Sequence, residues 1–157
     1  MKIASFLLPF FCAGLVLIQG CSKSLKEDEL LKSAIRHQTE DEYDEALADF
    51  DLLIKTFPKS EKVPEALFAM GVILQNKKKE YRKAESVFTR LVMNFPANPT
   101  AQSAAYQRAR IFVGQMHQPD SARAAFEFFL QHYPDAMSAP SARLELDSLK
   151  TNLHPAK

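Results

Sequence analysis

Cys21 is the residue whose type and position most clearly suit chemistry. Only two cysteines occur, Cys12 and Cys21, and both lie in the first 21 of the 157 residues. A thiolate is a good nucleophile, so a cysteine can carry a covalently attached group on its sulfur. Because no cysteine follows Cys21, the rest of the chain can form neither a disulfide framework nor a cysteine-based metal site. Any cysteine chemistry is therefore confined to the first 21 residues.

The other reactive side chains show no catalytic or metal-binding spacing. The acidic segment 40–45 opens a predicted helix, where negative charge favours the helix dipole. Lys77–Lys79 is predicted to be a solvated turn, with contact to an anionic partner or lipid head groups as the alternative. No glycine-rich phosphate loop occurs, so we expect no enzyme, no cofactor and no metal site. Each histidine is interpreted as solvent-exposed or as a local helix-end partner: His37, His117, His132 and His154.

Residues 1–20 have the layout of a secretory signal peptide. Lys2 precedes an apolar run, Ile3–Ile18, that is shorter than the ~20 residues needed to span a bilayer. The run is followed by Gln-Gly-Cys, and the segment 17–21 resembles the bacterial lipobox. This resemblance implies cleavage before Cys21 and a lipid on its sulfur, with enough acyl chains to hold the protein firmly in a membrane. Ordinary cleavage elsewhere and an uncleaved anchor are the alternatives.

The residues after Cys21 bear on location and charge. In many Gram-negative lipoproteins, an aspartate after the lipidated cysteine retains the protein in the inner membrane. The residue here is Ser22, and the resemblance therefore implies the periplasmic face of the outer membrane. Residues 22–26 are predicted to be a short polar tether. Removal of residues 1–20 takes away one of the 20 basic residues and none of the 19 acidic ones. The mature chain is then neutral, which predicts no nucleic-acid binding.

A three-fold internal repeat with a constant spacing of 38 residues follows the leader. Each copy contains a segment with apolar residues at helical spacing that ends in an aromatic-proline pair. The corresponding residues are Tyr43, Tyr81 and Pro119; Ala46, Ala84 and Ala122; Phe50, Phe88 and Phe126; Leu53, Leu91 and Phe129. A preceding segment is also in register, at Leu30, Phe68 and Tyr106; Ser33, Gly71 and Ala109; Ile35, Ile73 and Ile111.

The repeat predicts pairs of helices that bury their apolar stripes against each other. One such helix cannot bury its stripe alone, and an alanine permits the close approach of its partner. Asn98 and Pro99 are predicted to be an N-cap and the first residue of a helix. We predict seven helices, at about 25–39, 43–57, 63–76, 80–94, 99–113, 119–132 and 138–150. We predict a signal peptide at 1–20 and the lipidated cysteine with its tether at 21–26. The repeat domain is predicted at 27–150, with repeats at about 27–62, 63–98 and 99–137 and a cap at 138–150. Residues 151–157 are predicted to be a frayed tail.

The repeated segments resemble the tetratricopeptide repeat, whose second helix reads aromatic-x2-Ala-x3-aromatic and ends before a proline. The resemblance implies an all-α fold, a tetratricopeptide-like α-solenoid of three helical hairpins plus a C-terminal capping helix. The usual period of ~34 residues is stretched here, which we assign to longer loops at 75–80 and 96–100.

Segment 57–96, together with the cysteine shortly before the first repeat, resembles the BamD/YfiO-type outer-membrane lipoproteins, which help to assemble β-barrel proteins. That family typically carries more repeats than the three found here. The resemblance implies a membrane-anchored scaffold that binds other envelope proteins. Alternatives are an envelope or cell-division adaptor of the Tol-associated YbgF/CpoB type and a pilus or secretion pilot lipoprotein.

Partner binding is predicted on the faces of the first helices that the core does not use. Matched positions on these faces differ in chemistry, as at Ala69 and Gln107, whereas the core positions repeat. Repeat arrays curve, and their concave side offers a long surface for a partner segment. The predicted binding residues are Glu65, Phe68, Gln75, Ser103, Tyr106, Gln107 and Arg110.

Overall fold

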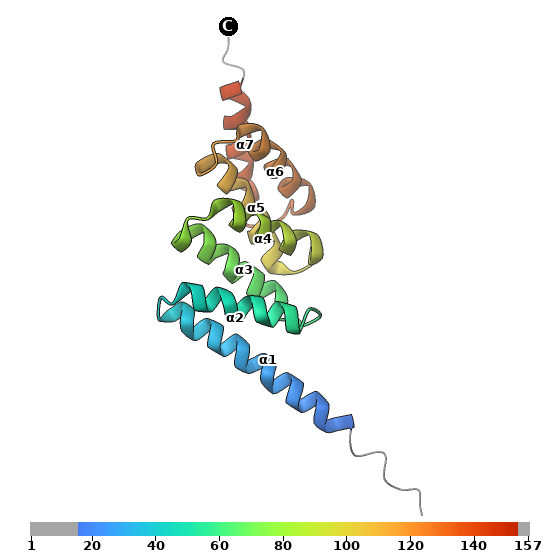
Figure 1. The fold of residues 1–157 in the computed structure, drawn as a ribbon. Helices are drawn as coiled ribbons and strands as arrows, with labels where there is room; N and C mark the ends of the chain where they lie inside the picture. The colour runs from blue at the N-terminus through green and yellow to red at the C-terminus, as the bar shows by residue number, and fades with distance from the viewer. Residues whose placement is uncertain (1–15, 154–157) are drawn as a thin grey trace, which may run out of the picture.

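The computed structural model describes residues 16–153 of the chain, which form a stack of helices (Figure 1). No strand forms within this range. Figure 1 shows the helices following one another from α1 at one end of the stack to α7 at the other. The elements are α1 (Val16–Thr39), α2 (Tyr43–Thr56), α3 (Val63–Ile73), the π-helical turn η1 (Leu74–Lys78), α4 (Tyr81–Asn94), α5 (Pro99–Gly114), α6 (Pro119–His132) and α7 (Ala139–Leu153).

The helices pair into three hairpins, α1 with α2, α3 with α4, and α5 with α6. Consecutive hairpins pack through α2 against α3 and through α4 against α5, and α7 packs against α6. The first helices α3 and α5 also contact each other. This order confirms the predicted all-α solenoid of three hairpins followed by one further helix.

The core lies at the repeated positions of the second helices. Phe50 is 1% exposed, and Phe88 and Phe126 are fully buried. The alanines one turn earlier, represented by Ala84, are fully buried as well. Burial of each large apolar side chain stabilises the fold by ~1.5–3 kcal/mol relative to leaving it exposed. The alanine, phenylalanine and following leucine or phenylalanine positions of the register therefore mark the core, as predicted, whereas Tyr43 and Tyr81 are only half-buried and Pro119 is exposed.

Gly71 shows why the first helices carry small residues in the same register. A Cβ atom on Gly71 would lie 2.3 Å from Cε1 of Phe88, closer than nonbonded carbon atoms approach. The phenyl ring of α4 thus occupies the space that a side chain on α3 would need. The corresponding residue in α5, Ala109, is fully buried.

The second helices end, and α5 begins, at the residues that the sequence predicted to stop or cap them. Each second helix stops at the aromatic residue before proline, where Phe57, Phe95 and Tyr133 donate their backbone N–H to the carbonyl four residues earlier. At the start of α5, the Asn98 side chain accepts a hydrogen bond of 2.9 Å from the backbone N–H of Thr100. Asn98 is therefore an N-cap, as predicted, with proline at the first helical position.

The turn inside each hairpin has a feature that the sequence did not reveal. One residue per turn has a left-handed backbone: Asp41 at φ 61°, Lys79 at φ 58° and His117 at φ 52°. These residues are again spaced by one repeat. Such backbone angles usually favour glycine. None of the three residues is glycine, so no residue type in the sequence indicated this turn geometry.

Several predicted element boundaries were wrong. Helix α1 begins at Val16 rather than near residue 25, so the predicted tether 22–26 is helical. No proline interrupts this stretch, and its lysines and leucine favour helix. Residues 74–78 form a π-helical turn where a loop at 75–80 was expected. Helix α7 continues to Leu153, into the predicted tail. Residues 1–15 of the predicted leader, and His154, lie outside the described residues.

Ile35 differs from its counterparts in the later repeats. It is 44% exposed, whereas Ile73 is 2% exposed and Ile111 is fully buried. In α3 and α5, a preceding hairpin covers this face. Within the described chain no hairpin precedes α1, so the same residue in the same register remains open to solvent.

Among the described helices, none is long and apolar enough to span a membrane.

Candidate functional site

The predicted binding residues all lie on first helices, except Gln75, which lies on the turn η1. Glu65, Ser103 and Arg110 are exposed, and the other four residues are half-buried. We call this face of the first helices the inner face. It is defined by matched positions on α3 and α5: Glu65 and Ser103, Phe68 and Tyr106, Ala69 and Gln107, Val72 and Arg110.

A groove of about 530 Å³ between α5 and α7 brings two of these residues together. Tyr106 and Arg110 line it from α5. Four further lining residues come from α7, and they lie one repeat after the inner-face positions of α5. Sequence reasoning assigned α7 only the role of a cap and missed this continuation, although the 38-residue register pointed to it. The α7 residues are Ser141, Leu144, Glu145 and Ser148.

Aromatic packing holds the two inner-face aromatic residues in place. The Tyr106 ring centroid lies 6.1 Å from that of Phe126 and 5.6 Å from that of Phe129, both on α6. Phe68 similarly lies 5.9 Å from Phe88 on α4. Phe68 and Tyr106 therefore pack against their own hairpin with one edge and remain half-exposed on the inner face.

Leu144 occupies the register position of Phe68 and Tyr106, but it is 73% exposed. In the hairpins, a second helix supplies the aromatic residues that cover this position. No second helix accompanies α7 within residues 16–153. The groove therefore has an uncovered leucine beside the ring of a rigidly packed tyrosine.

The groove also carries one charge of each sign. Arg110 lies on α5 and Glu145 on α7. Within the described chain, neither forms an ion pair with another side chain. Both charges are consequently available to an incoming partner.

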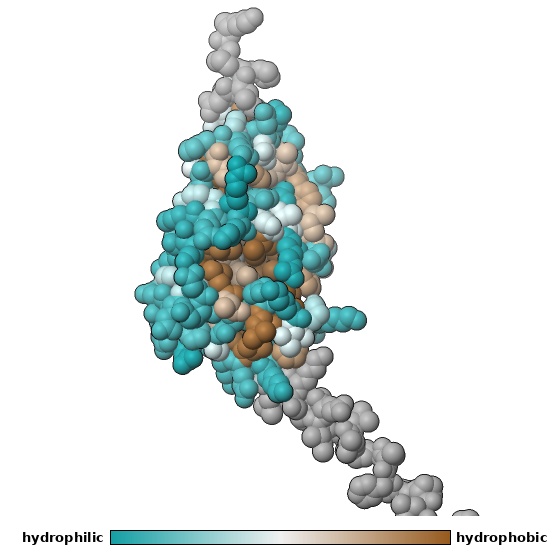
Figure 2. Space-filling view, in the orientation of Figure 1, coloured by the Kyte–Doolittle hydropathy of each residue, from teal (hydrophilic) through white to brown (hydrophobic). Residues whose placement is uncertain are grey.

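The N-terminal half of the inner face is more apolar. Phe68, Ala69 and Val72 on α3 are half-buried and pack against the core, as do Leu30 and Leu31 on α1. Figure 2 shows apolar side chains gathered on one face of the molecule over α2 and α3. The two halves of the array thus present different chemistry to a partner.

A second groove, of about 430 Å³, lies between α1 and α2 near the start of the stack. Its exposed apolar residue is Leu52, which is 49% exposed. It shares no residue with the groove between α5 and α7. The lining residues are Lys26, Glu29, Leu30, Ser33, Leu52, Thr56 and Phe57.

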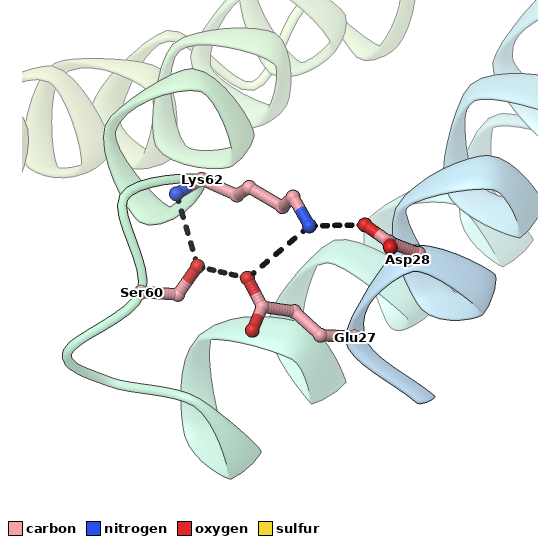
Figure 3. A network of polar contacts seen from close by, with 4 residues as sticks. All are labelled: Glu27, Asp28, Ser60 and Lys62. Carbon is pink, nitrogen blue, oxygen red and sulfur yellow. Dashed lines mark hydrogen bonds and ion pairs between the residues drawn. The ribbon is translucent and has the colours of Figure 1, made fainter. Parts of the chain in front are cut away.

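A polar network links the middle of α1 to the loop between α2 and α3 (Figure 3). Lys62 reaches two carboxylates of α1: it donates a hydrogen bond to Asp28, and its ammonium lies 3.5 Å from Glu27. Ser60 donates to Glu27 and accepts a hydrogen bond from the Lys62 backbone N–H. The hydrogen bond from Lys62 holds the pKa of Asp28 below its ordinary value, and the same contact raises the pKa of Lys62. The network thus joins α1 to the loop that precedes α3.

The lysine run departs from the predicted solvated turn at Lys78, which is half-buried and ion-paired, whereas Lys77 and Lys79 are exposed. The Lys77 ammonium lies 5.1 Å from the centre of the Tyr43 ring, and Lys78 lies 2.7 Å from Asp44. A hydrogen bond with Tyr43 raises the pKa of Lys77, and one with Asp44 raises that of Lys78. The π-helical turn directs the Lys77 and Lys78 side chains back onto the start of α2.

The described histidines behave as predicted. His37, at the end of α1, lies 3.0 Å from Asp49 and 3.7 Å from Glu42, which is a local helix-end arrangement. His132 stacks on Phe128 with 4.0 Å between ring centroids, and His117 is exposed. No group of three His, Cys, Asp or Glu side chains in the described part of the chain could hold a metal ion.

Comparison with known proteins places this array in a family. A model of the family YfiO, described as an outer membrane lipoprotein, matches residues 23–155. No curated protein matches the sequence. A crystal structure of a tetratricopeptide repeat protein from Parabacteroides merdae matches with 14% sequence identity and a TM-score of 0.42, over 80% of this chain and 60% of that one. Because the family match covers most of the sequence and includes the hairpins and α7, the chain belongs to the YfiO family of outer membrane lipoproteins.

Proposed function

We propose that this protein is anchored by a lipid on Cys21 to the periplasmic face of the outer membrane. The family match carries this proposal, since it begins at residue 23, two residues after the cysteine of the lipobox-like segment. Ser22 in place of aspartate supports the outer rather than the inner membrane. Helix α1 would then connect the lipid to the repeats without a flexible tether.

Metabolic labelling with an alkyne fatty acid tests the anchor. Wild-type protein should be labelled and should stay with membranes in high salt, because several acyl chains hold firmly. Cys21→Ser should be unlabelled and either unprocessed or soluble. Cys12→Ser is the matched control, since Cys12 lies within the leader, and it should be labelled like the wild type. An unlabelled wild type would reject the lipobox interpretation.

We further propose that the array is a non-catalytic scaffold that assists the assembly of β-barrel proteins by binding other envelope proteins on its inner face. Families of this repeat type act through protein-protein contacts. The differing chemistry at matched inner-face positions, beside core positions that stay apolar in every repeat, supports this use of the surface. No cofactor or metal is needed for it.

Affinity purification from solubilised membranes tests the scaffold role. Arg110→Glu, combined with substitutions of Gln107 and Tyr106, should abolish co-purification of the partner. Arg82→Glu on α4 is the control, since Arg82 is also exposed but lies off the inner face. Depletion of the protein should lower the amount of folded β-barrel proteins in the outer membrane. Unchanged co-purification after the triple substitution would remove the inner face from consideration, and unchanged β-barrel levels would point to an envelope adaptor or pilot role.

A further inference from the structure

The groove between α5 and α7 differs from the rest of the inner face in its lining. Three of its six lining residues carry hydroxyl groups, two carry opposite charges, and the remaining one is the exposed Leu144. Pockets for small molecules are lined mainly by apolar and aromatic side chains. A single exposed leucine amid polar groups also fits an acyl chain poorly. The lining instead fits the mixed side chains of a polypeptide.

The positions of the two charges in the groove determine where a bound partner segment must carry charged groups of its own. Arg110 lies on α5, while Leu144 and Glu145 lie on α7, and neither charge is satisfied by an ion pair within the described chain. An unpaired charge that a partner covers costs free energy unless the partner supplies an opposite charge. A partner covering both charges therefore needs an acidic group at one and a basic group at the other.

We propose that this groove binds a segment of another envelope protein that places an acidic side chain against Arg110, an apolar side chain on Leu144 and a basic side chain against Glu145. The half-buried ring of Tyr106 is held by Phe126 and Phe129, so it offers the apolar side chain a preformed wall. This inference rests on the proposed scaffold function and names the chemistry of the partner segment.

Site-specific photocrosslinking in the full-length, lipidated protein tests the inference. A benzophenone amino acid in place of Leu144 should capture a partner, and mass spectrometry of the crosslinked peptide identifies the segment. The segment should contain an acidic, an apolar and a basic residue in the stated arrangement. Arg110→Glu should lower the crosslink yield on the order of tenfold, and Arg110→Lys should retain most of it. Replacement of the captured acidic residue by lysine should restore the yield with Arg110→Glu.

Two control positions separate the outcomes. The same crosslinker at Met93, which is 64% exposed on α4, should give a pattern that Arg110→Glu does not change. Capture at Glu65 but not at Leu144 would leave the scaffold function standing and overturn this inference. Capture at neither position would overturn both. Capture of a second copy of this chain, a segment without the charge pair, or a yield insensitive to Arg110→Glu and Glu145→Lys would also overturn the inference.

Discussion

The second-helix core and the inner face share one 38-residue register, but they differ in whether the residue type is the same at matched positions. In the core, Phe50, Phe88 and Phe126 are the same residue and are at most 1% exposed. On the inner face, Val72 of α3 corresponds to Arg110 of α5. Packing at interior density admits few side-chain shapes, whereas a surface that faces solvent or a partner is free of that restriction. Core positions therefore keep small or large apolar side chains of fixed size class, whereas matched inner-face positions change between apolar, polar and charged residues.

The ends of the stack sharpen this comparison. Ile35 and Leu144 both occupy positions that the middle of the array covers, yet they are 44% and 73% exposed. Ile35 lacks a preceding hairpin, and Leu144 lacks an accompanying second helix within the described chain. Register alone therefore predicts burial only where both neighbours are present.

The largest expected effect comes from removing a core aromatic residue. Phe88→Ala should lower the free energy of unfolding by ~3–5 kcal/mol, since Phe88 is fully buried and contacts both Gly71 and Phe68. Such a loss approaches the total stability of many small domains, which is ~5–15 kcal/mol. Urea unfolding of the chain without leader and lipid measures it. Met93→Ala, at a position that is 64% exposed on the same helix, should change the value by less than ~0.5 kcal/mol. Equal effects of the two substitutions would contradict the assigned core.

A smaller effect is expected from adding a methyl group to the tight contact between α3 and α4. Gly71→Ala would place a Cβ atom within 2.3 Å of the Phe88 ring. Overpacking of this kind costs ~1–3 kcal/mol, which outweighs the ~1 kcal/mol by which alanine favours a helix over glycine. The substitution should therefore lower the melting temperature.

Gly114→Ala is the matched control for this prediction. Apart from the adjoining residues and the backbone of its own helix, no atom lies within 4 Å of a Cβ built on Gly114, the last residue of α5. Helix propensity then acts alone and should raise the free energy of unfolding by up to ~1 kcal/mol. Opposite signs for the two glycines would show that helix contact, rather than the residue type, decides the outcome. A gain in stability from Gly71→Ala would mean that α3 and α4 lie farther apart.

The hairpin turns should respond more weakly and in the stabilising direction. Lys79 has φ 58°, a conformation that costs a non-glycine residue ~1–2 kcal/mol. Lys79→Gly removes this strain but adds ~0.5–1 kcal/mol of chain entropy to be lost on folding. A net gain of ~0.5 kcal/mol is therefore expected in thermal unfolding. Asp41→Gly should gain less, since aspartate adopts this conformation more readily than lysine. A loss at Lys79 larger than that at Asp41 would argue against the left-handed turn.

The same contrast explains how much of the molecule the sequence revealed. The hairpins, their core and the cap at Asn98 were predictable, because burial and capping restrict residue type at fixed spacing. The left-handed turn residues were not, since none is glycine and their backbone is set by the closure of the hairpin. Tyr106 and Arg110 were among the seven predicted binding residues, but the groove that they line was not predicted. It is lined by α7 as well as by α5, and α7 was assigned only the role of a cap although the 38-residue register extends into it.

The smallest expected change in stability belongs to the inner face, and it completes the comparison. The double substitution Arg110→Glu with Glu145→Arg exchanges the two groove charges and leaves their sum unchanged. Neither side chain forms an ion pair in the described structure, and Arg110 is exposed, so the free energy of unfolding should change by less than ~0.5 kcal/mol. If the surface exists to contact a partner, the same double variant should lose that partner in co-purification although its circular-dichroism melt matches the wild type.

Phe88→Ala gives the converse pattern, since it should lose partner binding only in proportion to the fraction unfolded. Lowering the temperature until Phe88→Ala is folded should restore its binding, whereas no temperature should restore binding to the charge-exchanged variant. A charge-exchanged protein that melts well below the wild type would show that Arg110 and Glu145 support the fold. In that case the variation between repeats at these positions would reflect local packing. The distinction between a core with matching residues and a surface with differing residues would then fail at the groove between α5 and α7.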